Sequence, residues 1–213
     1  MSTISAASIQ VAYDQKVIID GLDCQLAEGK ITTIIGSNGC GKSTLLRAMS
    51  RLLPAHEGEV LLDGTDISSI KRKDLARTIS VLPQTPTAPE GLNVADLVSR
   101  GRHPHQSWIR QWSSTDEAEV HKALEMTGSM GLAERTLDSL SGGQRQRVWI
   151  SMVLAQNTDI LFLDEPTTYL DLATSVEILE LVQRLRRELD RTVVMVLHDL
   201  NLAVRYSDNL VVM

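Results

Sequence analysis

A glycine-rich segment with one lysine carries the strongest chemical signal in the chain. It reads Gly36-Ser37-Asn38-Gly39-Cys40-Gly41-Lys42-Ser43-Thr44, after a predicted strand and before a predicted helix. Glycines let consecutive backbone N–H groups converge on phosphate oxygens, and the positive end of the following helix points at the same anion. Lys42 adds a charge for the β- and γ-phosphates, and Ser43 can bind Mg²⁺. The pattern predicts a nucleoside triphosphate site; a chance glycine-rich turn is the alternative, which the flanking strand and helix disfavour.

Two adjacent carboxylates follow an apolar segment farther along the chain. Asp164 and Glu165 come directly after Ile160-Leu161-Phe162-Leu163, which predicts a buried strand. A metal-dependent phosphoryl-transfer site needs such a pair, because Asp164 can hold Mg²⁺ directly or through water while Glu165 polarises the attacking water. Alone, the segment would more often be a solvated acidic turn, but the phosphate loop favours the catalytic interpretation.

A second helix start with affinity for anions lies between these two motifs. It reads Leu140-Ser141-Gly142-Gly143-Gln144 ahead of a predicted long helix. One triphosphate need not use both helix starts of the same molecule. A head-to-tail dimer would place Ser141 of one copy over the γ-phosphate held by Lys42 of the other. The alternative is that Ser-Gly-Gly serves only as a helix cap.

Three single residues are further candidates for the site. Gln84 follows a predicted strand and can reach Mg²⁺ and the attacking water. His198 follows another strand, where an imidazole at the carboxyl edge of a sheet can contact a γ-phosphate. Tyr13 can stack on adenine. For each residue taken singly, an ordinary structural role is the alternative.

The segments that must position these residues alternate between strand and helix patterns. We expect strands at 8–12, 17–19, 31–35, 58–63 and 79–82, and a helix at 42–51. After Ser141 we expect a helix to about 156, a strand at 160–163, a helix at 174–188 and a strand at 193–197. This alternation predicts an α/β fold with a parallel sheet covered by helices.

The stretch from 93 to 133 has a different, helical character. Asn93 can cap a helix that begins at Val94, and Thr115 begins another that runs to Met126. Between them, Gly101–Gln106 is predicted to be a loop. The α/β core is therefore expected to carry a helical insertion of about forty residues.

Composition limits the classes of function. The 213 residues are 43% hydrophobic and 23% charged, which is typical of a soluble globular protein. A net charge of -6 disfavours a nucleic-acid partner. Cys24 and Cys40 are too few for a disulfide framework, which favours a reducing cytoplasm. Apolar runs such as Val193–Leu197 are too short to span a bilayer, and the N-terminus does not read as a signal peptide, so a role at a membrane would need another subunit.

Taken in order, the motifs resemble the ATP-binding cassette (ABC) family over essentially the whole chain. The matching features are Tyr13, the phosphate loop, Gln84, Leu140–Gln144, the strand to Glu165, Leu170-Asp171 and His198. The resemblance implies a P-loop NTPase core at 1–84 and 134–213, with an N-terminal antiparallel β subdomain, and a helical subdomain at 85–133. It also implies that Gln84 links the nucleotide site to that subdomain, that Asp171 lies at a dimer seam and that Glu165 and His198 are catalytic.

Other, less specific segments resemble the ATPases of ferric-siderophore importers, with the heme and vitamin B12 import ATPases as close relatives. They are Asn38–Gly41, Ser99–Gln106, Gln146–Ile150, Met152–Gln156 and Glu165–Asp171, in which Tyr169 stands where many cassettes carry a small residue. None of them touches the transported solute. Family members run some tens of residues past the strand at Leu210–Met213, so the resemblance implies a chain that is truncated at its C-terminus.

The expected function is an importer's ATPase at the cytoplasmic face of the membrane. ATP and Mg²⁺ are the expected cofactors; the ATP-bound homodimer, permease subunits and, indirectly, an extracytoplasmic substrate-binding protein are the expected partners, with no nucleic acid. The alternative is a soluble ABC ATPase acting on nucleic acid or the ribosome, which a single cassette, an acidic total and the lack of a heptad stretch disfavour. A third interpretation is an ATP-gated assembly module with negligible turnover.

Overall fold

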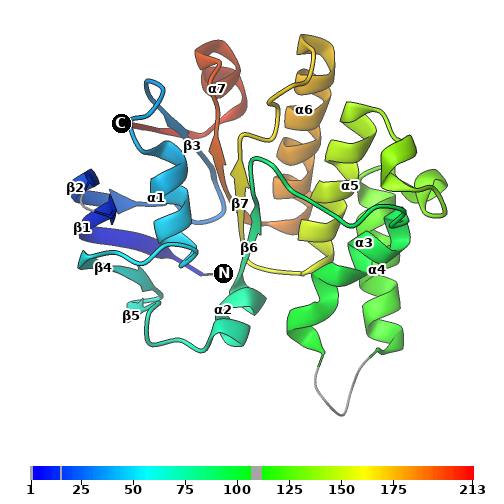
Figure 1. Cartoon of the computed structure of the whole chain (residues 1–213), viewed down its shortest axis with the longest axis horizontal. Coiled ribbons are helices and arrows are strands. Elements are labelled where there is room, and N and C mark those ends of the chain that lie inside the picture. Colours follow the sequence, from blue (N-terminus) through cyan, green and yellow to red (C-terminus); the bar gives the residue numbers. More distant parts are fainter. Residues whose placement is uncertain (1, 15, 107–111) are drawn as a thin grey trace.

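A five-stranded parallel sheet forms the centre of the molecule in the computed structural model, which describes residues 2–14, 16–106 and 112–213 (Figure 1). Its strand order is β6-β7-β8-β3-β9, and every neighbouring pair is parallel. The strands are β3 (Ile31–Ile35), β6 (Ile79–Leu82), β7 (Ile160–Asp164), β8 (Thr192–Val196) and β9 (Asn209–Val212). Parallel strands end at the same edge of a sheet, so the residues that follow β3, β6, β7 and β8 gather there.

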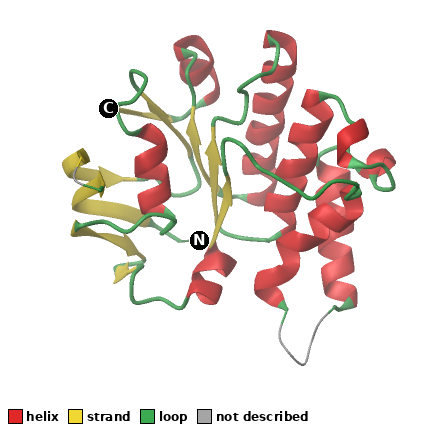
Figure 2. Ribbon diagram, viewed as in Figure 1, coloured by secondary structure: helices red, strands yellow, loops and turns green. Residues whose placement is uncertain are grey.

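An antiparallel sheet in the order β2-β1-β4-β5 lies beside this core (Figure 2). Its strands are β1 (Ile4–Tyr13), β2 (Lys16–Gln25), β4 (Glu57–Leu62) and β5 (Thr65–Asp66). The first two are longer than the predicted 8–12 and 17–19. Register shifts along β1, one of them beside Ser8 with φ of 46°, interrupt the period-two pattern, so the sequence revealed only parts of each strand.

Seven α-helices and three 3₁₀ helices complete the described part of the chain. The α-helices are α1 (Lys42–Met49), α2 (Arg72–Thr78), α3 (Val94–Ser99), α4 (Ser114–Met126), α5 (Gly142–Ala155), α6 (Leu172–Leu189) and α7 (Leu200–Tyr206). The 3₁₀ helices are Arg100–His105, Met130–Leu132 and Leu137–Ser139. The predicted cap is confirmed at Asn93, whose side chain accepts a hydrogen bond from the Asp96 N–H at 2.7 Å.

The predicted loop at Gly101–Gln106 is wrong, because Arg100–His105 forms a 3₁₀ helix. Tertiary contacts hold this segment. A Cβ at Gly101 would stand 2.2 Å from the Met152 carbonyl, so the backbone packs directly on α5. Arg102 is buried and donates to Asp116 at 2.9 Å and to the Ala155 carbonyl at 2.7 Å. These partners are distant in sequence, which is why the local pattern of Gly, Pro and His suggested a loop.

Alternating residues of the central strands face two different cores. Ile160 and Phe162 of β7 pack with α1 and the antiparallel sheet, whereas Leu161 and Leu163 pack with α5 and α6. Figure 1 shows this layering, with α3 and α4 lying beyond α5 on the side away from α1. Within the described ranges, no helix is both long and apolar enough to cross a membrane.

Candidate functional site

The loop between β3 and α1 has the backbone geometry of an anion site. Gly41 precedes α1 with φ of 104°, and no side chain caps the helix, so the cap leaves the first N–H groups free. A side chain at this position would be strained by the left-handed backbone, and its Cβ would also stand 3.0 Å from the Ile18 side chain. Lys42 is buried, and its Nζ donates to the carbonyls of Gly36 at 3.0 Å and Ser37 at 2.8 Å. A fixed positive charge therefore stands at the mouth of the loop.

A cavity of about 440 Å³ opens beside this loop. It is lined by residues from the loop, the antiparallel sheet and the ends of three parallel strands: Tyr13, Ile18, Asn38, Gly39, Gly41, Lys42, Ser43, Thr44, Gln84, Glu165 and His198. All but Ile18 are candidates from the sequence. Tyr13 is 42% exposed and offers its ring at the side of the cavity formed by β1 and β2, where Ile18 adds apolar surface. The structure therefore brings these candidates, which come from segments distant in sequence, to the same cavity.

Ser43 and Asp164 are in direct contact at the inner end of this site. The Ser43 hydroxyl donates to Asp164 Oδ1 at 2.7 Å. Burial raises the pKa of Asp164 and the charge of Glu165 adds to the effect, while the bond from Ser43 opposes it. A hydroxyl and a carboxylate oxygen this close together form the kind of hard oxygen pair that Mg²⁺ prefers, so the chemistry of these donors fits that ion.

Three side chains hold the carboxylate of Glu165. Gln84 Nε2 donates to Oε2 at 2.5 Å, the Thr168 hydroxyl donates to the same oxygen at 2.8 Å, and His198 Nε2 lies 2.6 Å from Oε1. Burial acts to raise the pKa of Glu165, but the bonds from Thr168, His198 and Gln84 outweigh it and hold the pKa below its ordinary value. The arrangement keeps an anionic proton acceptor beside the cavity.

Thr168 is the contact of Glu165 that sequence reasoning missed. The signal was present, because a hydroxyl three residues after a carboxylate in a short turn is well placed to bond back to it. Tertiary contacts were not needed to find it, unlike those of Gln84 and His198.

Ser141–Gln144 and Asp171 lie outside this cavity. Ser141 caps α5: its Oγ accepts from the Gln144 N–H at 3.3 Å, while Gln144 Oε1 accepts from the Ser141 N–H at 3.1 Å. Asp171 caps α6 through the Thr174 N–H at 2.8 Å, and bonds from Thr174 lower the pKa of its carboxyl. A Cβ at Gly143 would stand 2.5 Å from Thr174 Cγ2, so the two helix starts pack together. Both segments are therefore capped helix starts that lie outside the cavity of the phosphate loop.

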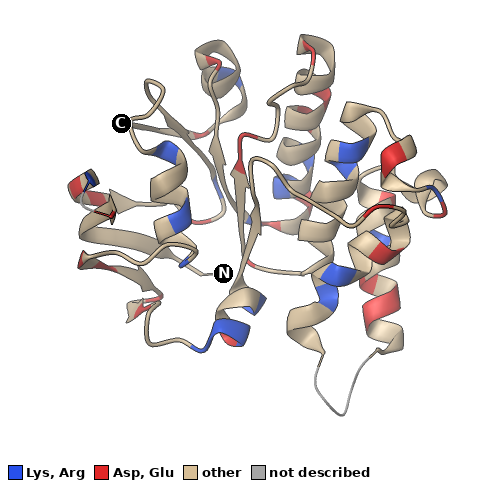
Figure 3. Cartoon of the chain, in the orientation of Figure 1, with Lys and Arg blue, Asp and Glu red and all other residues tan. Residues whose placement is uncertain are grey.

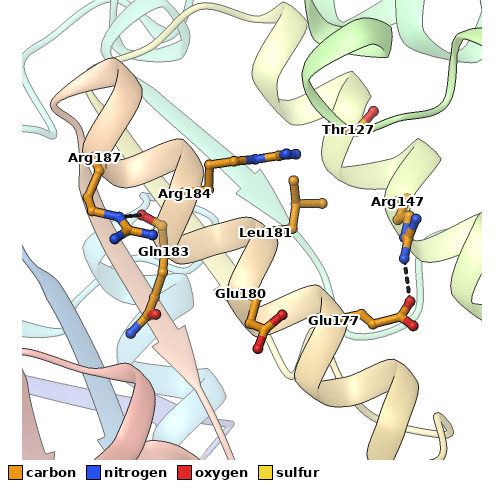
Figure 4. Close-up of a pocket in the computed structure, with 8 residues that line it drawn as sticks. All are labelled: Thr127, Arg147, Glu177, Glu180, Leu181, Gln183, Arg184 and Arg187. Carbon is orange, nitrogen blue, oxygen red and sulfur yellow. Dashed lines mark hydrogen bonds and ion pairs between the residues drawn. The ribbon is translucent and has the colours of Figure 1, made fainter.

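A larger cavity of about 550 Å³ lies away from the phosphate loop, between α5, α6 and the end of α4 (Figure 4). Arg147 pairs with Glu177 across it, and Arg184 donates to the Met126 carbonyl at 2.5 Å. Lysine, arginine, aspartate and glutamate are interspersed on the helices of this region (Figure 3). None of the residues predicted for the site lines this cavity.

Residues 19–168 match the family described as ABC transporter. The chain belongs to the ABC transporter family. The achromobactin transport ATP-binding protein CbrD of Dickeya dadantii is 54% identical over 211 residues, which are 99% of this chain and 78% of that protein. The iron(3+)-hydroxamate import ATP-binding protein FhuC of Bacillus subtilis is 52% identical over 207 residues, 97% of this chain and 77% of that protein.

A dimeric structure of MJ0796, a bacterial ABC transporter cassette, has the same fold. It superposes with a TM-score of 0.85 and 27% identity, covering 99% of this chain and 94% of that one. The predicted α/β fold, with a parallel sheet, an antiparallel sheet and covering helices, is confirmed. This ABC cassette is the ATP-binding subunit of a transporter and hydrolyses ATP.

Proposed function

We propose that this ABC subunit drives import of an iron–siderophore-like substrate, with permease subunits, from the cytoplasmic face of the membrane. One observation carries the ATPase assignment: the side chains of Gln84 and His198 both contact the Glu165 carboxylate, beside the phosphate loop. The names of CbrD and FhuC, achromobactin transport and iron(3+)-hydroxamate import, support the substrate class. Selection of the solute belongs to the permease and to an extracytoplasmic binding protein.

Hydrolysis follows from the placement of the lining residues. The loop N–H groups and Lys42 bind the β- and γ-phosphates, and Tyr13 stacks on adenine. Glu165 accepts a proton as the water oxygen bonds to the γ-phosphorus. The bond from that phosphorus to the β–γ bridging oxygen breaks, which yields ADP and phosphate. His198 donates to the γ-phosphate oxygens, where charge is held during the transfer.

Mg²⁺ would be held by Ser43, Asp164 and Gln84. Bound there, the ion would neutralise charge on the β- and γ-phosphate oxygens. The Ser43–Asp164 contact supports this assignment, since both oxygens already face each other. The amide oxygen of Gln84 would add a third oxygen ligand once the amide shifts, since its Nε2 donates to Glu165 in this structure.

Two copies of the chain would complete each site. The exposed positions of Ser141 and Gly142, remote from the cavity of their own chain, support a head-to-tail pair in which they cover the partner's nucleotide. Asp171 would lie at that seam. Closure would move the helical subdomain at 85–133 relative to the core at 1–84 and 134–213, with Gln84 as the connection, and so drive the membrane subunits.

Glu165→Gln tests this proposal. The variant keeps a hydrogen-bonding side chain but removes the proton acceptor, so it should bind ATP, hydrolyse it at least about 100-fold more slowly and accumulate as a dimer in ATP. Size-exclusion chromatography and phosphate release measure both effects. Normal turnover in this variant would overturn the assignment.

Uptake in cells tests the substrate class. Cells in which the chromosomal gene carries Glu165→Gln should lose uptake of radioactive iron supplied as a ferric siderophore, while uptake of an unrelated solute continues. Stimulation of the ATPase by DNA, RNA or ribosomes, with iron uptake intact, would favour the nucleic-acid alternative instead.

A further inference from the structure

We infer that Thr168 is a positioning residue for ATP hydrolysis, whose hydroxyl keeps the Glu165 carboxylate oriented while Gln84 and His198 turn to the nucleotide. The inference rests on the proposed function, in which Glu165 receives the proton of the attacking water. It concerns a residue that does not line the cavity and touches the reacting atoms only through Glu165.

The contact between Thr168 and Glu165 is local. Both residues lie in the turn that follows β7, where the Thr168 N–H donates to the Glu165 carbonyl at 3.2 Å and the Thr168 hydroxyl donates to Oε2 at 2.8 Å. Glu165 has φ of 53°, in the left-handed region that non-glycine residues seldom adopt. Both ends of the contact therefore belong to the same turn, so we expect the contact to be kept if the end of the strand shifts.

The other two partners of Glu165 come from distant segments. Gln84 follows β6 on the way to α3 and is exposed, and His198 follows β8 with 45% of its side chain exposed. His198 Nε2 carries at most one proton, so it cannot donate fully to Glu165 and to a phosphate together. Gln84 likewise reaches Mg²⁺ only by shifting its amide. Each of these contacts competes with the task assigned to the residue in catalysis.

Thr168 has no such competing task. It is half-buried, and its hydroxyl bonds only to Glu165 among the hydrogen bonds of the described residues. Glu165 is only 8% exposed, so its carboxylate has little room to move. With Oε2 held by Thr168, Oε1 is left to face the attacking water once His198 turns away. Loss of the hydroxyl would free the carboxylate to rotate, and small errors of orientation are costly in catalysis.

Thr168→Val and Thr168→Ser, each made in the 213-residue chain, test this inference by phosphate release at varied ATP. Valine keeps the shape of threonine but lacks the hydroxyl, so kcat should fall about 10- to 100-fold while KM for ATP changes less than about twofold. Serine keeps the hydroxyl and should retain most of the activity. Thr167→Val is the matched control, because the side chain of Thr167 makes no hydrogen bond within the described residues.

A double substitution separates action through Glu165 from any other effect. In the Glu165→Gln background, Thr168→Val should cause no further loss of kcat, since the carboxylate it positions is already gone. Wild-type kcat in Thr168→Val, equal loss in Thr168→Ser, or equal loss in Thr167→Val would each overturn the inference. If Thr168→Val fails to bind a fluorescent ATP analogue, Thr168→Ala replaces it with the same expectation. Normal turnover in Glu165→Gln alone would instead reject the proposed function.

Discussion

Two helices of this ABC cassette begin at residues assigned to phosphate, and they begin in different ways. At α1 the residue before the helix is Gly41, which has a left-handed backbone and offers no capping side chain. At α5 it is Ser141, which forms a reciprocal capping box with Gln144. Helix α1 therefore leaves its first N–H groups for an anion, whereas α5 uses the N–H groups of Ser141 and Gln144 within its own chain.

The difference shows what each helix start can do alone. The α1 start, with Lys42, can bind a phosphate within one molecule. At α5 the Ser141 oxygen accepts from Gln144, so the proton of this hydroxyl is not used in the cap and can be donated to another group. That single hydroxyl donor suits one further contact to an anion that is already held elsewhere. The contrast supports the division of each site between two copies of the chain.

Lys42→Ala should have the largest effect, because it alters the phosphate-binding start of α1. It removes the only formal positive charge among the residues of the loop, so turnover should fall about 1000-fold and ATP binding should weaken sharply. Lys30→Ala, an exposed lysine just before β3, is the control and should behave as wild type. Isothermal titration with ATP and phosphate release would measure both. Equal ATP affinity in the two variants would remove Lys42 from the site.

Ser141→Ala should separate capping from catalysis at α5. Loss of one donor to the partner's phosphate should lower kcat about 100-fold, while ATP affinity of the isolated chain stays the same. The control is Ser113→Ala, since Ser113 forms the same capping box with Asp116 at α4. That variant should lose about 1 kcal/mol of stability to thermal or urea unfolding and keep its kcat. Equal kcat in the two variants would make Ser141 a cap only.

Gly41→Ala should have a smaller effect, through the backbone. A left-handed alanine costs about 1–2 kcal/mol, and the new Cβ would press on Ile18, so ATP affinity should fall about tenfold. Gly131→Ala, where nothing lies within 4 Å of the added Cβ, should leave affinity unchanged. Titration of a fluorescent ATP analogue would compare them, and equal affinities would show that the Gly41 conformation is dispensable.

Low pH should weaken the capping box of α4 but not that of α5. This is the smallest of the expected effects, and it concerns stability. Burial acts to raise the pKa of Asp116, but bonds from Ser113 and Arg102 hold it below its ordinary value of 3.8. A lowered folded pKa gives stability that is present above pH 3.8 and is lost as pH falls through the folded value. Gln144 does not titrate. Asp116→Asn should therefore flatten the decline of Tm below pH 3.8, and an unchanged slope would contradict this.

Much of the site followed from local sequence because its chemistry is local. The loop from Gly36 to Thr44 depends on glycine conformations, and Asp164 and Glu165 on a strand end, so both were predicted. The 3₁₀ helix at Arg100–His105 was missed because its Arg102 is held by Asp116 and Ala155. Helices α2 and α7 were missed because seven residues give too little periodicity.

By itself the sequence determined the local groups of the candidate site: a glycine-rich helix start with Lys42, and a carboxylate pair at the end of an apolar strand. Only the tertiary structure decided that Gln84, Thr168 and His198 share the Glu165 carboxylate. The reason is the strand order, which sets β6 and β8 on either side of β7. Which strands lie side by side depends on the burial of whole strand faces, and that cannot be read from any short segment of the sequence.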